Sequence, residues 1–153
     1  MENKKNWLIL LIVLNIGFIW GNSMMNPDKS HEFSNFVYDL LGRLFSFGRD
    51  ELPQDGGEHL LRKFAHAFEF MVLGVLITAL FGKKSYKRIG AIVLSGITVA
   101  ACDETIQIFT NRGSAVRDVL IDTVGFVTGV ALAGLIIYLI IIVRKKKETK
   151  RLC

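Results

Sequence analysis

The sequence predicts an all-α integral membrane protein with four transmembrane helices, both termini cytoplasmic, and an amphipathic helix in the first extracytoplasmic loop. Hydrophobic residues make up 51% of the 153-residue chain and are gathered into long blocks. About 20 apolar residues suffice to cross a hydrocarbon core of ~30 Å. We therefore expect a single membrane domain over residues 1–153, with spans at about 7–25, 64–81, 89–109 and 116–143 and a basic cytoplasmic tail at 144–153.

The first span has two interpretations. Lys4 and Lys5 followed by "WLILLIVLNIGFIW" are also typical of a signal peptide, with Gly21 and Ser23 as small residues near a cleavage point. The hydrophobic stretch continues through "GNSMM" to about 19 residues, a length that suits an uncleaved span. We expect the segment to be retained as a transmembrane helix.

The distribution of charge predicts the orientation. The N-terminus, the connection "KKSYKR" at 83–88 and the tail at 144–153 hold twelve of the nineteen Lys and Arg residues, beside two acids. Positive charge collects in cytoplasmic segments of membrane proteins. We therefore expect both termini on the cytoplasmic side of the membrane, with the basic segments close to anionic lipid. No nucleic-acid-binding motif accompanies the basic tail, so we expect no nucleic acid partner.

The first outer connection contains a second helical pattern. Apolar residues recur at helical spacing over residues 33–45, which predicts the amphipathic helix of about four turns. Lying on the outer leaflet, covering the bundle as a lid and simply connecting two spans are three uses that the pattern leaves open.

Ionisable residues inside the predicted spans are the main functional signal, because they are costly in a bilayer. Those of the second, third and fourth spans all lie near the outer end. At 1.5 Å per residue, each set falls within roughly 12 Å of the outer boundary. This common depth predicts a polar site that faces the extracytoplasmic side. Its candidate acid–base groups are His66, Glu69, Asp103, Glu104 and Asp122, and its candidate binding groups are Arg62, Lys63, Gln107, Arg112, Arg117, Asp118 and Ser23.

Small residues continue the polar faces along two helices. In the third span Gly96 and Ala100 share a face with Asp103, and in the fourth Gly125 and Gly129 form a GxxxG on the face of Asp122. Small residues allow membrane helices to approach closely. We therefore expect the charged faces to point into the bundle rather than toward lipid.

Several roles for the cluster remain open. Its charges nearly balance, which favours a network of ion pairs that staples three helices together. Carboxylates beside His66 equally suit acid–base chemistry on, or binding of, a polar headgroup, with the arginines holding phosphate or carboxylate. A divalent metal is a weaker candidate, because His66 is the one His within a span and the arginines would repel a cation. Ser23 is a weak candidate nucleophile, since "NSMM" carries no strained elbow motif.

Three stretches together resemble the VanZ-like family of bacterial membrane proteins. These are "WGNSMM", "LRKFAHAFEFMVLG" and "DETIQIFTNRGSAVRDVLIDTVGFVTG", and the resemblance runs from about Trp7 to Gly129. It implies a role in the cell envelope and in low-level resistance to the glycopeptide teicoplanin. The implied partner is a membrane lipid, a lipid-linked peptidoglycan precursor in the outer leaflet, or the lipoglycopeptide itself. The resemblance does not imply whether the protein is an enzyme.

Overall fold

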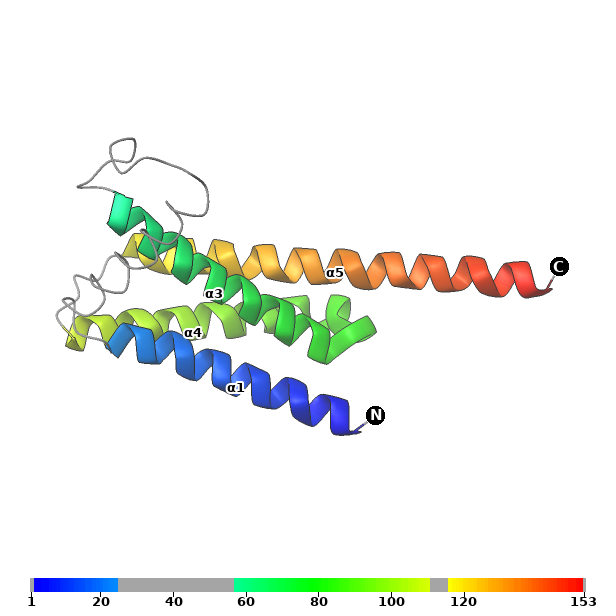
Figure 1. Ribbon diagram of the computed structural model, residues 1–153, viewed down its shortest axis with the longest axis horizontal. Helices are drawn as coiled ribbons and strands as arrows, with labels where there is room; N and C mark the ends of the chain where they lie inside the picture. The colour runs from blue at the N-terminus through cyan, green and yellow to red at the C-terminus, as the bar shows by residue number, and fades with distance from the viewer. Residues whose placement is uncertain (1, 25–56, 111–115, 153) are drawn as a thin grey trace, which may run out of the picture.

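The computed structural model describes residues 2–24, 57–110 and 116–152, and within them the chain is helical, as predicted, apart from a turn at Thr110. The amphipathic helix expected at 33–45 lies outside the described residues. Figure 1 shows the long helices side by side, with both chain termini at the same end of the bundle. The elements in order are α1 (Glu2–Met24), α3 (Gly57–Phe81), the 3₁₀ helix η1 (Gly82–Arg88), α4 (Ile89–Phe109) and α5 (Val116–Leu152).

Three stretches of the described chain are long and apolar enough to cross a membrane: Asn3–Met24, Lys63–Phe109 and Val116–Thr149. The second stretch contains both α3 and α4. The chain turns between them at Gly82, whose φ of 53° lies in the left-handed region that glycine adopts without strain. Helix α4 then runs back along the bundle (Figure 1).

The closest packing in the bundle joins α3 to α5. A Cβ atom added at Gly125 would overlap the backbone carbonyl of Ala67, and one added at Gly129 would overlap that of Met71. The two glycines are four residues apart, as are their two partners, so successive turns of the helices meet in register. The GxxxG therefore brings two backbones into contact, and the sequence-based expectation that it faces the bundle is confirmed.

Phe126 fills the centre of the bundle. Its side chain is fully buried, and its backbone carbonyl lies where a Cβ of Gly74 on α3 would stand. On the other side, its ring occupies the space that a side chain at Gly96 on α4 would need. Glycines on two helices thus make room for one aromatic residue of α5. Around it lies an apolar core that includes Ile19, Phe70, Leu73, Ile92 and Val130.

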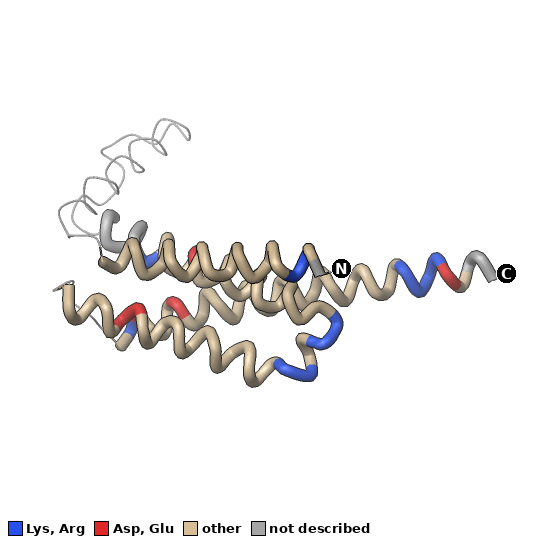
Figure 2. Tube along the Cα trace, turned by 90° about the horizontal axis from the view of Figure 1, so that it is seen from below, with Lys and Arg blue, Asp and Glu red and all other residues tan. Residues whose placement is uncertain are grey.

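Charge is distributed unevenly along the bundle. Figure 2 shows the basic N-terminus, η1 and the basic end of α5 on the side where both termini lie. The acidic residues of α3, α4 and the start of α5 lie toward the opposite end, with the cations Lys63 and Arg117 beside them, and Glu148 is an acid among the basic residues of α5. The basic segment expected as a tail at 144–153 continues α5 as helix to Leu152.

We predict that Gly125→Leu lowers the free energy of unfolding by at least about 2 kcal/mol, because the new side chain meets a backbone carbonyl that cannot rotate away. Thermal unfolding of the purified protein in detergent measures the change. Gly17→Leu is the matched control, since nothing lies within 4 Å of a Cβ at that position. Equal stability of the two variants would contradict the close α3–α5 contact.

Candidate functional site

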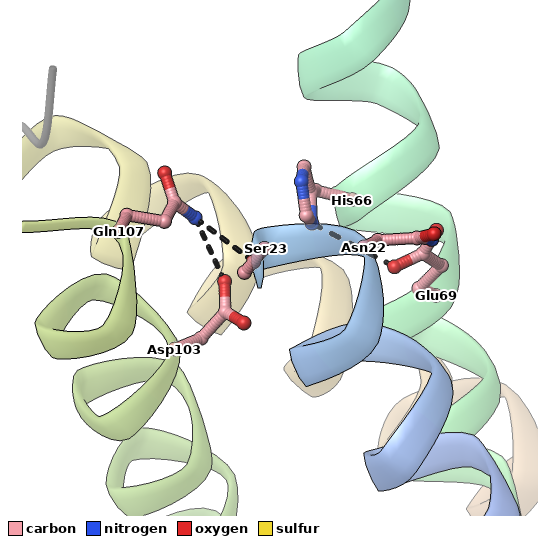
Figure 3. Close-up of polar contacts among 6 residues, drawn as sticks. All are labelled: Asn22, Ser23, His66, Glu69, Asp103 and Gln107. Atoms are coloured by element: carbon pink, nitrogen blue, oxygen red, sulfur yellow. Dashed lines mark hydrogen bonds and ion pairs between the residues drawn. The ribbon is translucent and has the colours of Figure 1, made fainter. Parts of the chain in front are cut away.

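The candidate site lies at the acidic end of the bundle, where the last turn of α1 comes between α3 and α4 (Figure 3). Helix α1 contributes Asn22 and Ser23, which point in different directions. Asn22 faces the α3 side chains, and Ser23 faces those of α4. A single helical turn thus connects two polar groups on two other helices.

The first group is centred on Glu69. Its Oε1 accepts a hydrogen bond of 2.8 Å from Asn22 Nδ2, and its Oε2 lies 3.6 Å from His66 Nδ1. The second distance is too long for a hydrogen bond, but it allows electrostatic attraction when the imidazole is protonated. His66 and Glu69 are three residues apart and share a helix face, as the sequence predicted.

The second group joins α1 to α4. Gln107 Nε2 lies 2.8 Å from Asp103 Oδ2 and 3.3 Å from Ser23 Oγ, and it donates to both oxygens. The hydroxyl of Thr110 lies 3.2 Å from the backbone carbonyl of Ser23. Ser23 and Asp103 are completely buried. Among the residues that the structure describes, no donor reaches Asp103 Oδ1.

Two further buried carboxylates complete the acidic cluster. Asp122 of α5 is 3% exposed and Glu104 of α4 is 8% exposed. The carboxyl group of Asp122 lies within electrostatic reach of those on α3, α4 and α5. The carboxylates that the sequence predicted at one depth in the membrane therefore lie within electrostatic reach of Asp122 in the structure. The acids that interact with Asp122 are Glu69, Asp103, Glu104 and Asp118.

Of the four cations predicted to bind a ligand, the structure describes the side chains of two. Lys63 Nζ forms an ion pair of 2.8 Å with Asp118 Oδ1, and both side chains are partly exposed. This pair joins α3 to α5 at the edge of the cluster. Arg117 is exposed. Arg112 and the side chain of Arg62 lie outside the described residues.

The geometry of the site also bears on two candidate roles, metal binding by the acidic residues and nucleophilic attack by Ser23. Within the described part of the chain, no three His, Cys, Asp or Glu side chains are arranged to hold a metal ion. Ser23 Oγ accepts a hydrogen bond from the Gln107 amide, which cannot take up a proton. That contact holds the hydroxyl in place and does not activate it as a nucleophile.

Two residues of the site were missed by the sequence-based prediction. Asn22 bonds to Glu69, and Thr110 lies against the end of α1. Neither is ionisable, so a search for charges inside apolar blocks passes over both. The signal available was the adjacency of Asn22 to Ser23 in "GNS", at the same depth as the acids.

Comparison with known proteins identifies the family of the chain. The sequence profile of the VanZ/LLP1 family matches residues 7–143. The chain belongs to the VanZ/LLP1 family. It is also similar to an uncharacterized membrane protein, YwnJ, of Bacillus subtilis (strain 168), with 31% identity over 91 residues. That match covers 60% of this chain and 56% of the relative, so the chain spans just over half of the relative's length. No solved structure matches the chain.

We predict a coupling free energy of about 1 kcal/mol between Asn22 and Glu69, typical of a side-chain hydrogen bond between membrane helices. A double-mutant cycle of Asn22→Ala and Glu69→Ala, followed by unfolding in detergent, measures it. Asn15→Ala paired with Glu69→Ala is the control, because Asn15 lies two turns away on α1 and should show coupling near zero. Equal coupling in the two cycles would refute the Asn22–Glu69 contact.

Proposed function

We propose that this VanZ/LLP1 protein crosses the bacterial cytoplasmic membrane four times, with both termini in the cytoplasm. The helices α1, α3, α4 and α5 would be the four spans. The concentration of basic segments at one end of the bundle in Figure 2 supports this topology, because basic segments favour the cytoplasmic side. The acidic cluster then faces the extracytoplasmic side.

In this orientation the cluster would bind or act on a lipid-linked envelope substrate in the outer leaflet. Buried carboxylates and the Gln107 amide are suited to the hydroxyl and amine groups of a sugar–peptide headgroup. Arginines near the boundary would hold its phosphates. Engaging a peptidoglycan precursor, or an acylated glycopeptide lying in the same leaflet, would give low-level protection against teicoplanin.

The observation that carries the proposal is the carboxylate of Asp103. It is completely buried, yet only one of its oxygens accepts a hydrogen bond from the described residues. A buried polar atom without a partner costs about 1–3 kcal/mol. An oxygen without a hydrogen-bond partner among the described residues adds no hydrogen bond to their helix contacts, whereas a ligand donor would satisfy it.

The alternative is a structural or binding module without catalysis, whose intramembrane polar groups staple the helices. The contacts Asn22–Glu69, Ser23–Gln107 and Lys63–Asp118 favour this alternative, because each one joins two helices. The two accounts differ on Asp103, whose one hydrogen bond from the described residues comes from Gln107 of the same helix and reaches α1 only through that amide.

We predict that cells making Asp103→Asn or Glu69→Gln protein become as susceptible to teicoplanin as cells that lack the protein. Each change keeps the size of the side chain and removes a carboxylate from the ligand site. Minimum inhibitory concentrations are compared at equal amounts of membrane-inserted protein. Cys102→Ser is the matched control, because Cys102 is exposed and next to Asp103 in sequence. Full protection by both site variants would overturn the proposal.

We also predict which cysteines an impermeant thiol reagent labels in intact cells. In a protein with Cys102 and Cys153 replaced by Ser, Phe109→Cys at the end of α4 should be labelled directly. Tyr86→Cys in η1 should be labelled only after the membrane is opened. Both native side chains are well exposed, at 83% and 69%. Labelling of Tyr86→Cys in intact cells would contradict the topology.

A further inference from the structure

We propose that the groove between α4, η1 and α5 at the basic end of the bundle binds one anionic phospholipid. This site lies away from the acidic cluster, and it rests on the proposed topology but not on the ligand proposed for that cluster. The groove has a volume of about 580 Å³, and α3 contributes to it through Thr78. Its apolar walls include Ile89, Val93, Val130, Ile137 and Ile141.

The groove exists because α4 and α5 touch at one level and leave space at another. They meet where the ring of Phe126 packs on Gly96. Toward the basic end, Gly134 of α5 lines the groove, and nothing lies within 4 Å of a Cβ built there. An open apolar slot of this kind accommodates an acyl chain without any shift of the helices.

The positive charge of η1, which forms part of the groove, favours an anionic headgroup. Lys83 lines the groove, and η1 also carries Lys84, Lys87 and Arg88. Within the described residues, no carboxylate forms an ion pair with any of these cations. Basic pockets between membrane helices on the cytoplasmic side are suited to anionic lipid headgroups. The phosphate of a bound lipid would supply the missing negative charge.

Two further features fit a phospholipid rather than a soluble anion. Tyr86 and Tyr138 line the groove and are largely exposed, as is typical of aromatic residues at the level of lipid headgroups. Thr78 is 1% exposed, and its hydroxyl has no hydrogen-bond partner among the described residues. Thr78 lies on α3 just before η1, deeper than Lys83, where an ester carbonyl of the lipid would accept its hydrogen bond.

The test is native mass spectrometry of the full-length protein, delipidated in detergent and titrated with dioleoyl phosphatidylglycerol or dioleoyl phosphatidylcholine. We expect one phosphatidylglycerol per chain, bound about tenfold more tightly than phosphatidylcholine, because Lys83 lines the groove and η1 carries three more cations. Gly134→Phe should abolish this preference by filling the slot without changing any charge. Lys83→Gln should weaken the phosphatidylglycerol complex and leave that of phosphatidylcholine unchanged.

Gly17→Phe on α1 is the matched control, since its Cβ also has nothing within 4 Å, and it should bind like the wild type. Equal binding of the two lipids by the wild type would overturn the proposal. So would an undiminished preference in Gly134→Phe, which would indicate adsorption to surface lysines. Displacement of the lipid by millimolar soluble glycerol phosphate would show a site for phosphate alone and would also overturn it.

Discussion

Two helical backbones touch where Gly125 and Gly129 of α5 meet the carbonyls of Ala67 and Met71 on α3. Lipid supplies no hydrophobic force between helices, so close packing of this kind has to hold a membrane bundle together. The contact also fixes the register of the two helices. Asp122 lies one turn before the first glycine on the same face, so the register delivers its carboxylate to the level of the α3 polar groups.

Helices α1 and α4 are held to this pair by different means. Near the core, apolar residues of both helices pack around Phe70, Leu73 and Phe126. At the acidic end, hydrogen bonds replace them, and the last turn of α1 bonds to Glu69 on one side and Gln107 on the other. Polar groups at this depth are costly unless satisfied. Among the described residues, the bundle supplies partners for Gln107 and for one oxygen of Glu69, while other buried oxygens, Asp103 Oδ1 and Glu69 Oε2 among them, have no hydrogen-bond partner.

The sequence predicted the helices that the structure describes, but not the contacts between them. Residues 89–109 form a helix as expected, and the predicted inward face of α4, including Gly96, Ala100 and Asp103, is buried. These predictions succeeded because apolar length and small-residue spacing are local properties. The pairing of Asn22 with Glu69 and of Lys63 with Asp118 depends on how each helix is rotated. That rotation is set by packing between distant segments, which no local pattern contains.

A ligand site and a structural network predict different stabilities for the Asp103→Asn protein. Its free energy of unfolding in detergent is therefore the most direct measurement. Our account predicts stability equal to the wild type or higher by about 1 kcal/mol. Asn keeps an oxygen for Gln107 and puts an amide donor among neighbouring carboxylates. A loss of about 2 kcal/mol or more would contradict the account and make Asp103 a structural residue.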